Sequence, residues 1–367
     1  MKNKLFVFGT VIIVIIVCGI SYYFYNMLHT NIPTYSDNIE QNELLNKEEN
    51  VTENQENEQS EIKKKNIKIY SGNDRPIAIM TDNNVNAQPQ SNINLAYIVY
   101  EIIVEGNETR LMPVFKGVPD DTILGPVRSV RHYFLDYMKE NDAICGHLGQ
   151  SPQAEMDIKI LKMDDINGQI YDTMKARTET SLFWRSKERN APHNAYTSIG
   201  SLRKIMEQEG YSKTSNKKSV LNYVEEEINL NGENDIIANS VTIPYASKHK
   251  VKYVYNDETK RYTRYSKGKL QKDKETGEDI TVKNIIITFV YNYTIDDGED
   301  KGRQSLNNVG VANGYYVTNG KAMRILCKKD SRTEQTVYTD DFGNEIDVND
   351  GNTFINICPI DAEVTFE

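Results

Sequence analysis

An uncharged apolar run near the N-terminus constrains this chain more than any other feature of its sequence. Leu5–Met27 comprises 23 residues without one charged side chain. At about 1.5 Å per residue, a helix of that length crosses a hydrocarbon core of about 30 Å. Lys2 and Lys4 precede the run and no base follows before Lys47, so the positive-inside rule predicts a cytoplasmic N-terminus. We therefore expect residues 1–28 to form a single-pass anchor in the cell membrane, with the folded part extracellular.

Two other interpretations of the apolar run stay open. A lipoprotein signal would attach its lipid to Cys18, but Val17 precedes it where a small residue is normally required. A cleaved signal peptide is less consistent with the length of the run, and no small-residue cleavage site ends it. The uncleaved anchor is the interpretation that we favour.

The segment after the run is acidic and polar. Nine acids and one base lie between Leu28 and Ile62, which accounts for most of the formal net charge of -10. Residues 29–66 contain almost no large apolar side chains, so they cannot bury enough surface to offset the entropy of folding. We therefore predict a disordered acidic stalk over residues 29–66. The rest of the chain is nearly balanced in charge and gives no indication of a nucleic-acid partner.

Hydrophobic periodicity predicts a mixed α/β domain over residues 67–215. Asn94–Gly106 fits either a helix or a strand. Pro113 suggests that its strand lies at a sheet edge, because proline cannot donate to a ladder. Ser151 is placed to cap a helix that starts at Pro152. Strands that alternate with helices are typical of α/β layers. We expect strands at 75–83, 109–117 and 143–149 and helices at 129–141, 151–163 and 198–210.

The pattern changes after a predicted linker at residues 216–240. From residue 241 to 367 apolar and polar residues alternate between turns rich in Gly, Asn and Asp, which predicts a β-rich, mainly antiparallel domain. The sequences TNGK (318–321) and DDFGNE (340–345) are typical of hairpin turns. The predicted fold class is therefore an α/β domain followed by a β-rich domain.

The four cysteines give no sign of a zinc site, because none of their spacings matches a zinc pattern. Cys145 is expected to be a buried thiol in a strand. Cys327 and Cys358 could form a disulfide, but the sequence does not establish that they are close.

Two arginines next to a predicted helix N-terminus are the most unusual polar feature. Arg128 and Arg131 are expected on the first turn of the helix 129–141, where the positive end of the helix dipole disfavours cations. A nearby anion would explain why two cations lie at this end of the helix. The alternative is that the arginines form an ion pair with Glu101 or Glu105.

Other polar residues join the arginines as candidates, each with a structural alternative. Glu101 and Glu105, four apart, could act as acid and base or simply pair with the arginines. Histidines in polar turns could transfer protons or only fix their loops. The predicted catalytic groups are Glu101, Glu105, His147 and His193. The predicted ligand-binding residues are Asp82, Asn83, Arg110, Arg128, Arg131, Ser151 and Asn194.

Several blocks of the sequence resemble one known family. RPIAIMTDN, GPVRSVRHYFLD, HLGQSP and APHNAYTS, followed by VKNIIITF and NDGNTFINICP, are similar in order to the YerB-like family of domains of unknown function. The resemblance covers roughly residues 70–360. It implies a cell-surface protein of Gram-positive bacteria with two consecutive domains and no assigned activity. Val17 departs from the lipoprotein signal that typical members carry.

The candidates support a hypothesis with two forms. The arginines, acids and histidines are expected to line one cleft that holds an anionic envelope component, such as peptidoglycan or its polyprenyl-linked precursors. In one form the protein is a glycan-acting enzyme in which Glu101 or Glu105 transfers protons. In the other it is a non-catalytic binding or scaffold protein for cell-wall enzymes. Neither a cofactor nor a metal is expected, because the phosphate-binding, dinucleotide-binding and zinc-protease motifs are all missing from the sequence.

Overall fold

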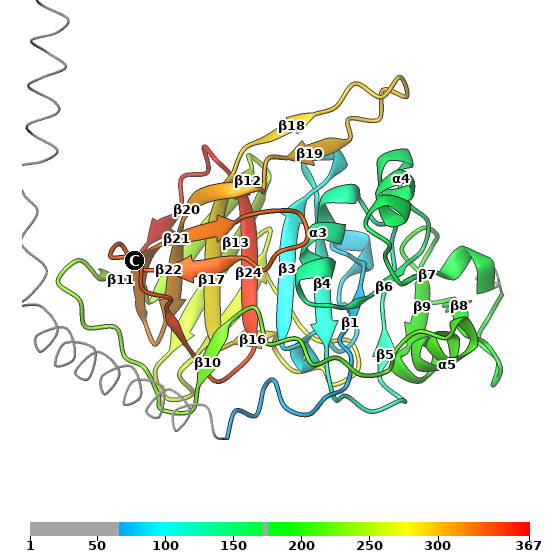
Figure 1. The fold of residues 1–367 in the computed structure, drawn as a ribbon, viewed down its shortest axis with the longest axis horizontal. Helices are drawn as coiled ribbons and strands as arrows, with labels where there is room; N and C mark the ends of the chain where they lie inside the picture. The colour runs from blue at the N-terminus through cyan, green and yellow to red at the C-terminus, as the bar shows by residue number, and fades with distance from the viewer. Residues whose placement is uncertain (1–65, 172–174) are drawn as a thin grey trace, which may run out of the picture. The chain divides into compact units, whose positions relative to one another are not determined.

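The computed structural model describes residues 66–171 and 175–367 (Figure 1). The predicted anchor and nearly all of the predicted stalk lie outside these ranges, so both stay predictions. Among the described residues no helix is both long enough and apolar enough to cross a membrane. The chain from Lys63 to Glu367 forms one compact unit.

A 12-stranded mixed sheet forms the centre of this unit, in the order β11-β21-β20-β17-β24-β3-β4-β1-β6-β7 with β2 and β22 beside this path. Strands from both predicted domains belong to it, because β24 lies parallel to β3 and pairs Asn356 with Glu101. The sheet therefore contains strands from both sides of the predicted linker at residues 216–240. Its strands are β1 (Ile77–Ile79), β2 (Thr81–Asp82), β3 (Ile98–Ile103), β4 (Thr109–Phe115), β6 (Ile144–His147), β7 (Asp165–Asn167), β11 (Ile236–Ile237), β17 (Asn284–Val290), β20 (Gly310–Thr318), β21 (Lys321–Lys329), β22 (Val337–Thr339) and β24 (Thr353–Pro359).

A smaller sheet packs on one face of the central sheet, and helix α3 (His132–Glu140) packs on the other. Tyr253 of the smaller sheet donates from its hydroxyl to Asn356 Oδ1 at 3.2 Å. On the opposite face Tyr100 donates to Glu140 Oε1 of α3 at 2.8 Å. Because both faces are covered, all six residues of β3 are buried. The smaller sheet contains β12 (Ser240–Ala246), β13 (His249–Asn256), β14 (Arg261–Ser266), β15 (Lys269–Leu270), β16 (Thr281–Val282) and β25 (Thr365–Phe366).

Helix α4 begins where the sequence predicts a cap. Ser151 Oγ accepts a hydrogen bond from the backbone N–H of Ala154 at 3.2 Å, as predicted. Ser198 caps α5 in the same way, and Gly210 ends it in the left-handed region. The α-helices are α3 (His132–Glu140), α4 (Pro152–Ile160) and α5 (Ile199–Glu209), and the 3-10 helices are η1 (Val85–Ala87), η2 (Ile93–Leu95), η3 (Glu105–Asn107) and η4 (Gly168–Tyr171).

Three small sheets complete the fold. The hairpin of β18 and β19 projects from the body and runs toward α4 (Figure 1), where Asp297 Oδ2 accepts from Gln153 Nε2 at 3.2 Å. The small sheets contain β5 (Ile123–Leu124), β8 (Phe183–Arg185) and β9 (Ala195–Ser198), then β10 (Asn222–Val224) and β23 (Asp347–Asn349), then β18 (Asn292–Thr294) and β19 (Gln304–Leu306).

Several local expectations can be compared with these elements. The ambiguous segment 94–106 contains strand β3. The edge position expected from Pro113 is wrong, because β4 lies between β3 and β1. On the β1 side, the pairing of β4 is interrupted between the Ala78–Val114 pair and the Thr81–Leu111 pair. Pro113 lies in this interrupted stretch. TNGK forms the predicted hairpin turn between β20 and β21.

Other expectations are met only in part or not at all. DDFGNE forms a turn with an isolated bridge between Thr339 and Glu345 and a hydrogen bond from Asp340 N to Asn344 O at 2.9 Å, but it does not join two paired strands. Cys145 is a buried free thiol, and Cys327 and Cys358 are free as well, so the disulfide that the sequence left open is not formed.

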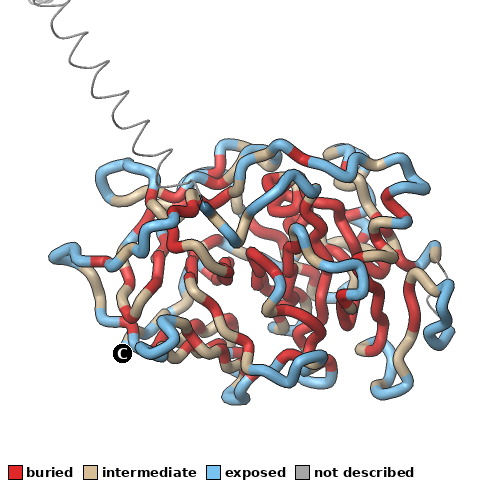
Figure 2. Tube along the Cα trace, turned by 90° about the horizontal axis from the view of Figure 1, so that it is seen from below, coloured by how far each residue is buried: buried red, intermediate tan, exposed pale blue. Residues whose placement is uncertain are grey.

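The core runs along the centre of the molecule (Figure 2) and contains the ion pair of Arg264 with Glu101. Arg264 Nη2 on β14 donates to Glu101 Oε2 on β3 at 2.5 Å, and both side chains are 0% exposed. The pair connects the two sheets across their interface. Burial raises the pKa of Glu101, but Arg264 and His249 outweigh it and lower the pKa to about 2.

Candidate functional site

The two arginines of the GPVRSVR segment lie before α3 rather than on its first turn. Arg128 is extended, with its N–H bonded to Met80 O at 2.9 Å and its carbonyl accepting from Leu148 N at 3.0 Å. Arg131 is the N-cap residue of α3 and has β-region backbone angles. The predicted position on the helix is therefore wrong, because neighbouring strands and loops take the backbone hydrogen bonds of this segment.

Gly125 fixes where the extended segment begins. Its φ of +147° is unfavourable for residues with a side chain, and a Cβ atom there would lie 2.7 Å from Tyr196 Cδ1. The close approach lets Val127 N donate to Ala195 O at 2.7 Å. The segment is thus held against β9, whose preceding loop carries His193.

One carboxylate joins Arg128 to His193. Asp82 Oδ2 accepts from Arg128 Nη1 at 2.7 Å and from His193 Nδ1 at 2.7 Å, while Asp82 Oδ1 accepts from Asn84 N at 3.0 Å. An ionised carboxylate can only accept, so Nδ1 is the donor, and in the neutral form of the ring Nε2 presents a lone pair. The side chains of Arg128 and His193 are 23% and 19% exposed, against 6% for Asp82. We call Asp82, Arg128 and His193 the Asp82 site.

Asn194 positions the loop that carries His193. Its amide donates to Ser186 O at 2.9 Å and to Arg189 O at 3.1 Å, and its Oδ1 accepts from Arg185 Nη1 at 3.0 Å. These bonds tie the two ends of the β8–β9 loop together. Burial and the charge of Arg128 lower the pKa of Arg185, so the two guanidinium groups are close enough to repel.

A second charged cluster joins Arg110 and Arg131 to Glu105. Arg131 binds Glu105 with two nitrogens, Nε to Oε1 and Nη2 to Oε2, the latter at 3.0 Å. Arg110 donates to Ser129 O, and its Nη2 lies 3.7 Å from Glu105 Oε2. Burial, reinforced by the charge of Arg131, lowers the pKa of Arg110 to about 9. Burial alone would raise the pKa of Glu105, but the arginines lower it.

The two clusters adjoin on the sheet. Asp82 and Arg110 are paired residues of β2 and β4, which places their side chains on the same side. Arg110, Arg128 and Arg131 face the two carboxylates of Asp82 and Glu105 across the clusters, so these five groups carry one positive charge in excess. This local excess stands out in a chain with a net charge of -10. The arrangement can attract an anion to Arg128.

The structure does not bring the other candidates to this place, so the expectation of one cleft that holds them all is wrong. Glu101 is in the core with Arg264, and Asn83 donates to it at 3.1 Å. His147 is fully buried and contacts Gly149 O at 2.8 Å and Asp165 Oδ2 at 3.2 Å, which fixes its loop. Ser151 is a helix cap.

Sequence reasoning missed Arg264, His249 and Arg185. The alternation of Tyr262, Arg264 and Ser266 along β14 was the available signal, because it places all three on one face of the strand. An arginine in such a position is expected to need a buried carboxylate. Nothing in the sequence could show that the partner would be Glu101.

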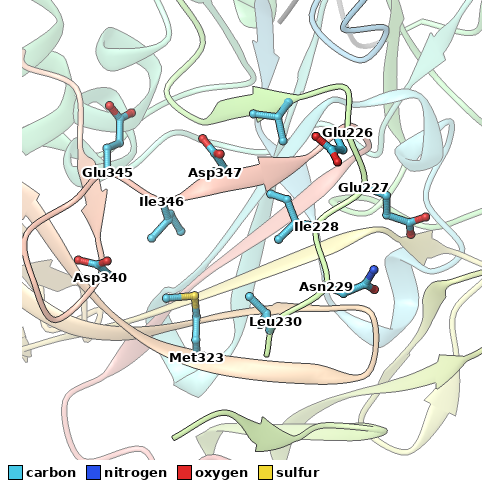
Figure 3. A pocket seen from close by; sticks show the side chains of 11 residues that line it. Glu226, Glu227, Ile228, Asn229, Leu230, Met323, Asp340, Glu345, Ile346 and Asp347 are labelled. Atoms are coloured by element: carbon cyan, nitrogen blue, oxygen red, sulfur yellow. The ribbon is translucent and has the colours of Figure 1, made fainter. Parts of the chain in front are cut away.

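A separate pocket of about 510 Å³ has a lining whose charge does not favour an anion. Its floor is apolar, with Leu230 and Met323 directed into it, and acids surround the floor (Figure 3). The acids of its lining are Glu226, Glu227, Asp340, Glu345 and Asp347. This pocket contains none of the predicted ligand-binding residues, so the predicted anion site does not lie in it.

Comparison with known proteins identifies the family to which this chain belongs. A family profile described as the N-terminal domain of the protein of unknown function DUF3048 matches residues 63–212, and the profile of the DUF3048 C-terminal domain matches residues 241–355. The chain belongs to this family.

A relative and a solved structure agree with this assignment. The chain is 31% identical over 289 residues to "Putative lipoprotein YerB" of Bacillus subtilis (strain 168). The aligned region covers 78% of this chain and 81% of the relative. The crystal structure of the YerB protein from Bacillus subtilis is similar with a TM-score of 0.67 at 30% identity, covering 80% of this chain and 94% of that one. The predicted resemblance to the YerB-like family is confirmed.

Proposed function

We propose that the protein is a membrane-anchored, extracytoplasmic component of the cell envelope, and that its Asp82 site binds an anionic glycan ligand and transfers a proton through His193. The observation that carries the proposal is the shared carboxylate of Asp82. It orients Arg128 and His193 side by side and leaves both partly exposed.

The chemistry of the site follows from its hydrogen bonds. His193 donates from Nδ1 to Asp82, so its Nε2 can accept a proton from a ligand, and the carboxylate stabilises the resulting imidazolium. Arg128 uses one nitrogen on Asp82, and its other nitrogens have no partner among the described residues. A phosphate or carboxylate bound there would bring a neighbouring hydroxyl or water toward Nε2.

The cellular setting is supported by the sequence and by the relative. The run Leu5–Met27 suits an anchor, and the relative in Bacillus subtilis is named as a lipoprotein. Peptidoglycan and its polyprenyl-linked precursors are the anionic glycans that such a location offers.

The test uses full-length protein in detergent, incubated with purified peptidoglycan, followed by mass spectrometry of the soluble muropeptides. We expect new products, and we expect His193→Asn to reduce their rate of formation by about 10²-fold or more. Asparagine can still donate to Asp82 but cannot act as a base. His132→Asn is the matched control, because His132 is a partly exposed histidine that contacts Ser305 Oγ at 2.9 Å on another element. Products that persist unchanged in His193→Asn would contradict the proposal.

A non-catalytic role is the second candidate, and the pairing of charges favours it. Each of the three predicted arginines already contacts a carboxylate, as expected of a stable surface rather than of a substrate cleft. Retention of the protein on peptidoglycan without products, weakened by Arg128→Gln, would support a binding or scaffold protein for cell-wall enzymes.

A further inference from the structure

An aromatic strip lies on the part of the molecule formed by β17, β18 and β20. Its first ring group is Phe289, Tyr315 and Phe366. The ring centroid of Tyr315 lies 6.0 Å from that of Phe289 and 4.9 Å from that of Phe366. Its second group is Tyr291 and Tyr293, with centroids 5.9 Å apart and ring planes 25° from parallel. Only Val290 separates Phe289 from Tyr291, so the two groups are neighbours along the chain.

The second ring group is open to solvent. Tyr291 is 51% exposed and Tyr293 is 40% exposed. Neither hydroxyl bonds to any residue that the structure describes, whereas buried tyrosines such as Tyr100 and Tyr133 donate to the protein. Aromatic rings with unpaired polar tips are typical of binding surfaces.

Two members of the first ring group, Phe289 and Tyr315, line a pocket of about 290 Å³ together with polar side chains. Those polar side chains are Asn313, Arg324 and Asp341. All three are exposed and make no hydrogen bond or ion pair with the described residues. The pocket thus combines apolar ring faces with an unused amide, an unused guanidinium and an unused carboxylate.

These groups define the chemistry of a ligand. Flat aromatic faces pack against the C–H faces of sugar rings, and exposed donors and acceptors bind hydroxyl groups. Arg324 and Asp341 cancel in charge, so the pocket favours a neutral, hydroxyl-rich ligand over an anion. This balance differs from the positive excess beside the Asp82 site.

We propose that the aromatic strip and its pocket bind the neutral sugar backbone of a glycan chain. The proposal deepens the proposed envelope function by naming the polymer, but it uses none of the residues of the Asp82 site. Grooves lined with aromatic residues also bind proline-rich peptides. The charged pair and the free amide favour the glycan, and a peptide ligand is an outcome that the test distinguishes.

The test is calorimetric titration of the full-length protein with chitohexaose, a neutral chain of N-acetylglucosamine, in a detergent without a sugar headgroup. We expect measurable binding that falls by at least about tenfold in Tyr291→Ala and in Tyr293→Ala. Tyr293→Phe keeps the ring and should stay within about threefold of the wild type. Asp341→Asn should also weaken binding, because it removes an acceptor for sugar hydroxyls.

Two controls separate this proposal from loss of folding and from the Asp82 site. Ile170→Ala removes a side chain that is 75% exposed on η4 and should leave binding unchanged. His193→Asn should also leave chitohexaose binding unchanged, even where it abolishes product formation. The proposal is overturned if chitohexaose does not bind, if the double variant Tyr291→Ala/Tyr293→Ala binds it as well as the wild type, or if a decaproline peptide binds at the strip in its place.

Discussion

The same three chemical groups occur twice in this molecule, in opposite surroundings. Asp82, Arg128 and His193 lie close to the surface, with Asp82 buried and the other two partly exposed. Glu101, Arg264 and His249 lie in the core, where we call them the Glu101 cluster. The arginine to carboxylate distance is 2.7 Å at the surface and 2.5 Å in the core.

What differs between the two trios is exposure. The side chains of Arg128 and His193 are 23% and 19% exposed, whereas those of Arg264 and His249 are 0% and 2% exposed. A carboxylate, a guanidinium and an imidazole in contact therefore do not define a functional site. The buried trio joins two sheets and has no access to a ligand, while two members of the other trio, Arg128 and His193, are partly open to solvent.

The largest expected effect comes from breaking the buried pair. Arg264→Met leaves Glu101 as an unpaired buried carboxylate and should lower the free energy of unfolding by about 3–5 kcal/mol. Urea denaturation followed by the fluorescence of Trp184, the single tryptophan, measures the change. The double variant Glu101→Gln/Arg264→Met removes both charges and should recover part of the loss. A double variant that is less stable than Arg264→Met would show that the pair does not act through charge.

The second-largest expected effect is the change of stability with pH that the Glu101 cluster causes. The pKa of Glu101 is lowered to about 2 in the folded protein, against about 4.3 unfolded. The ionised form thus stabilises the fold above the unfolded pKa, and this contribution is lost as the pH falls toward 2. It is worth about 3 kcal/mol at neutral pH.

Comparison of the wild type with Glu101→Gln isolates this contribution, because other carboxylates titrate in both proteins. The difference in their free energies of unfolding should shrink as the pH is lowered from about 5 to 2. A difference that stays constant over this range would mean that the pKa of Glu101 is not lowered by folding.

The contrast between the trios also shows what the sequence could reveal. Periodicity and cap residues predicted α4, α5 and the β20–β21 hairpin, because these depend on neighbouring residues. The pairing of β24 with β3 could not be predicted, since it joins segments more than two hundred residues apart. Glu101 was therefore placed among the catalytic candidates, although β24 and the smaller sheet bury it.

The Asp82 site could be predicted only in part, because the contacts among its residues also join segments far apart in the sequence. Asp82 was recognised as a polar group at a strand end and His193 as a histidine in a polar turn, whereas Arg128 was expected on the first turn of a helix. The direct contacts among them depend on how the extended segment after Gly125 fits between β2 and β9. Local sequence predicts a helix start there, and tertiary hydrogen bonds determine the actual conformation.

The smallest expected change in stability comes from the exposed trio. Arg128→Gln breaks an ion pair whose arginine is partly solvated, so the free energy of unfolding should fall by no more than about 1 kcal/mol. Binding of inorganic phosphate, measured by calorimetry, should nevertheless be lost, because Arg128 supplies the guanidinium nitrogens that remain free. Arg203→Gln is the matched control, since Arg203 pairs with the exposed Asp120 on α5's side of the molecule. Equal phosphate binding by both variants would show that the exposed trio, like the buried one, only supports the fold.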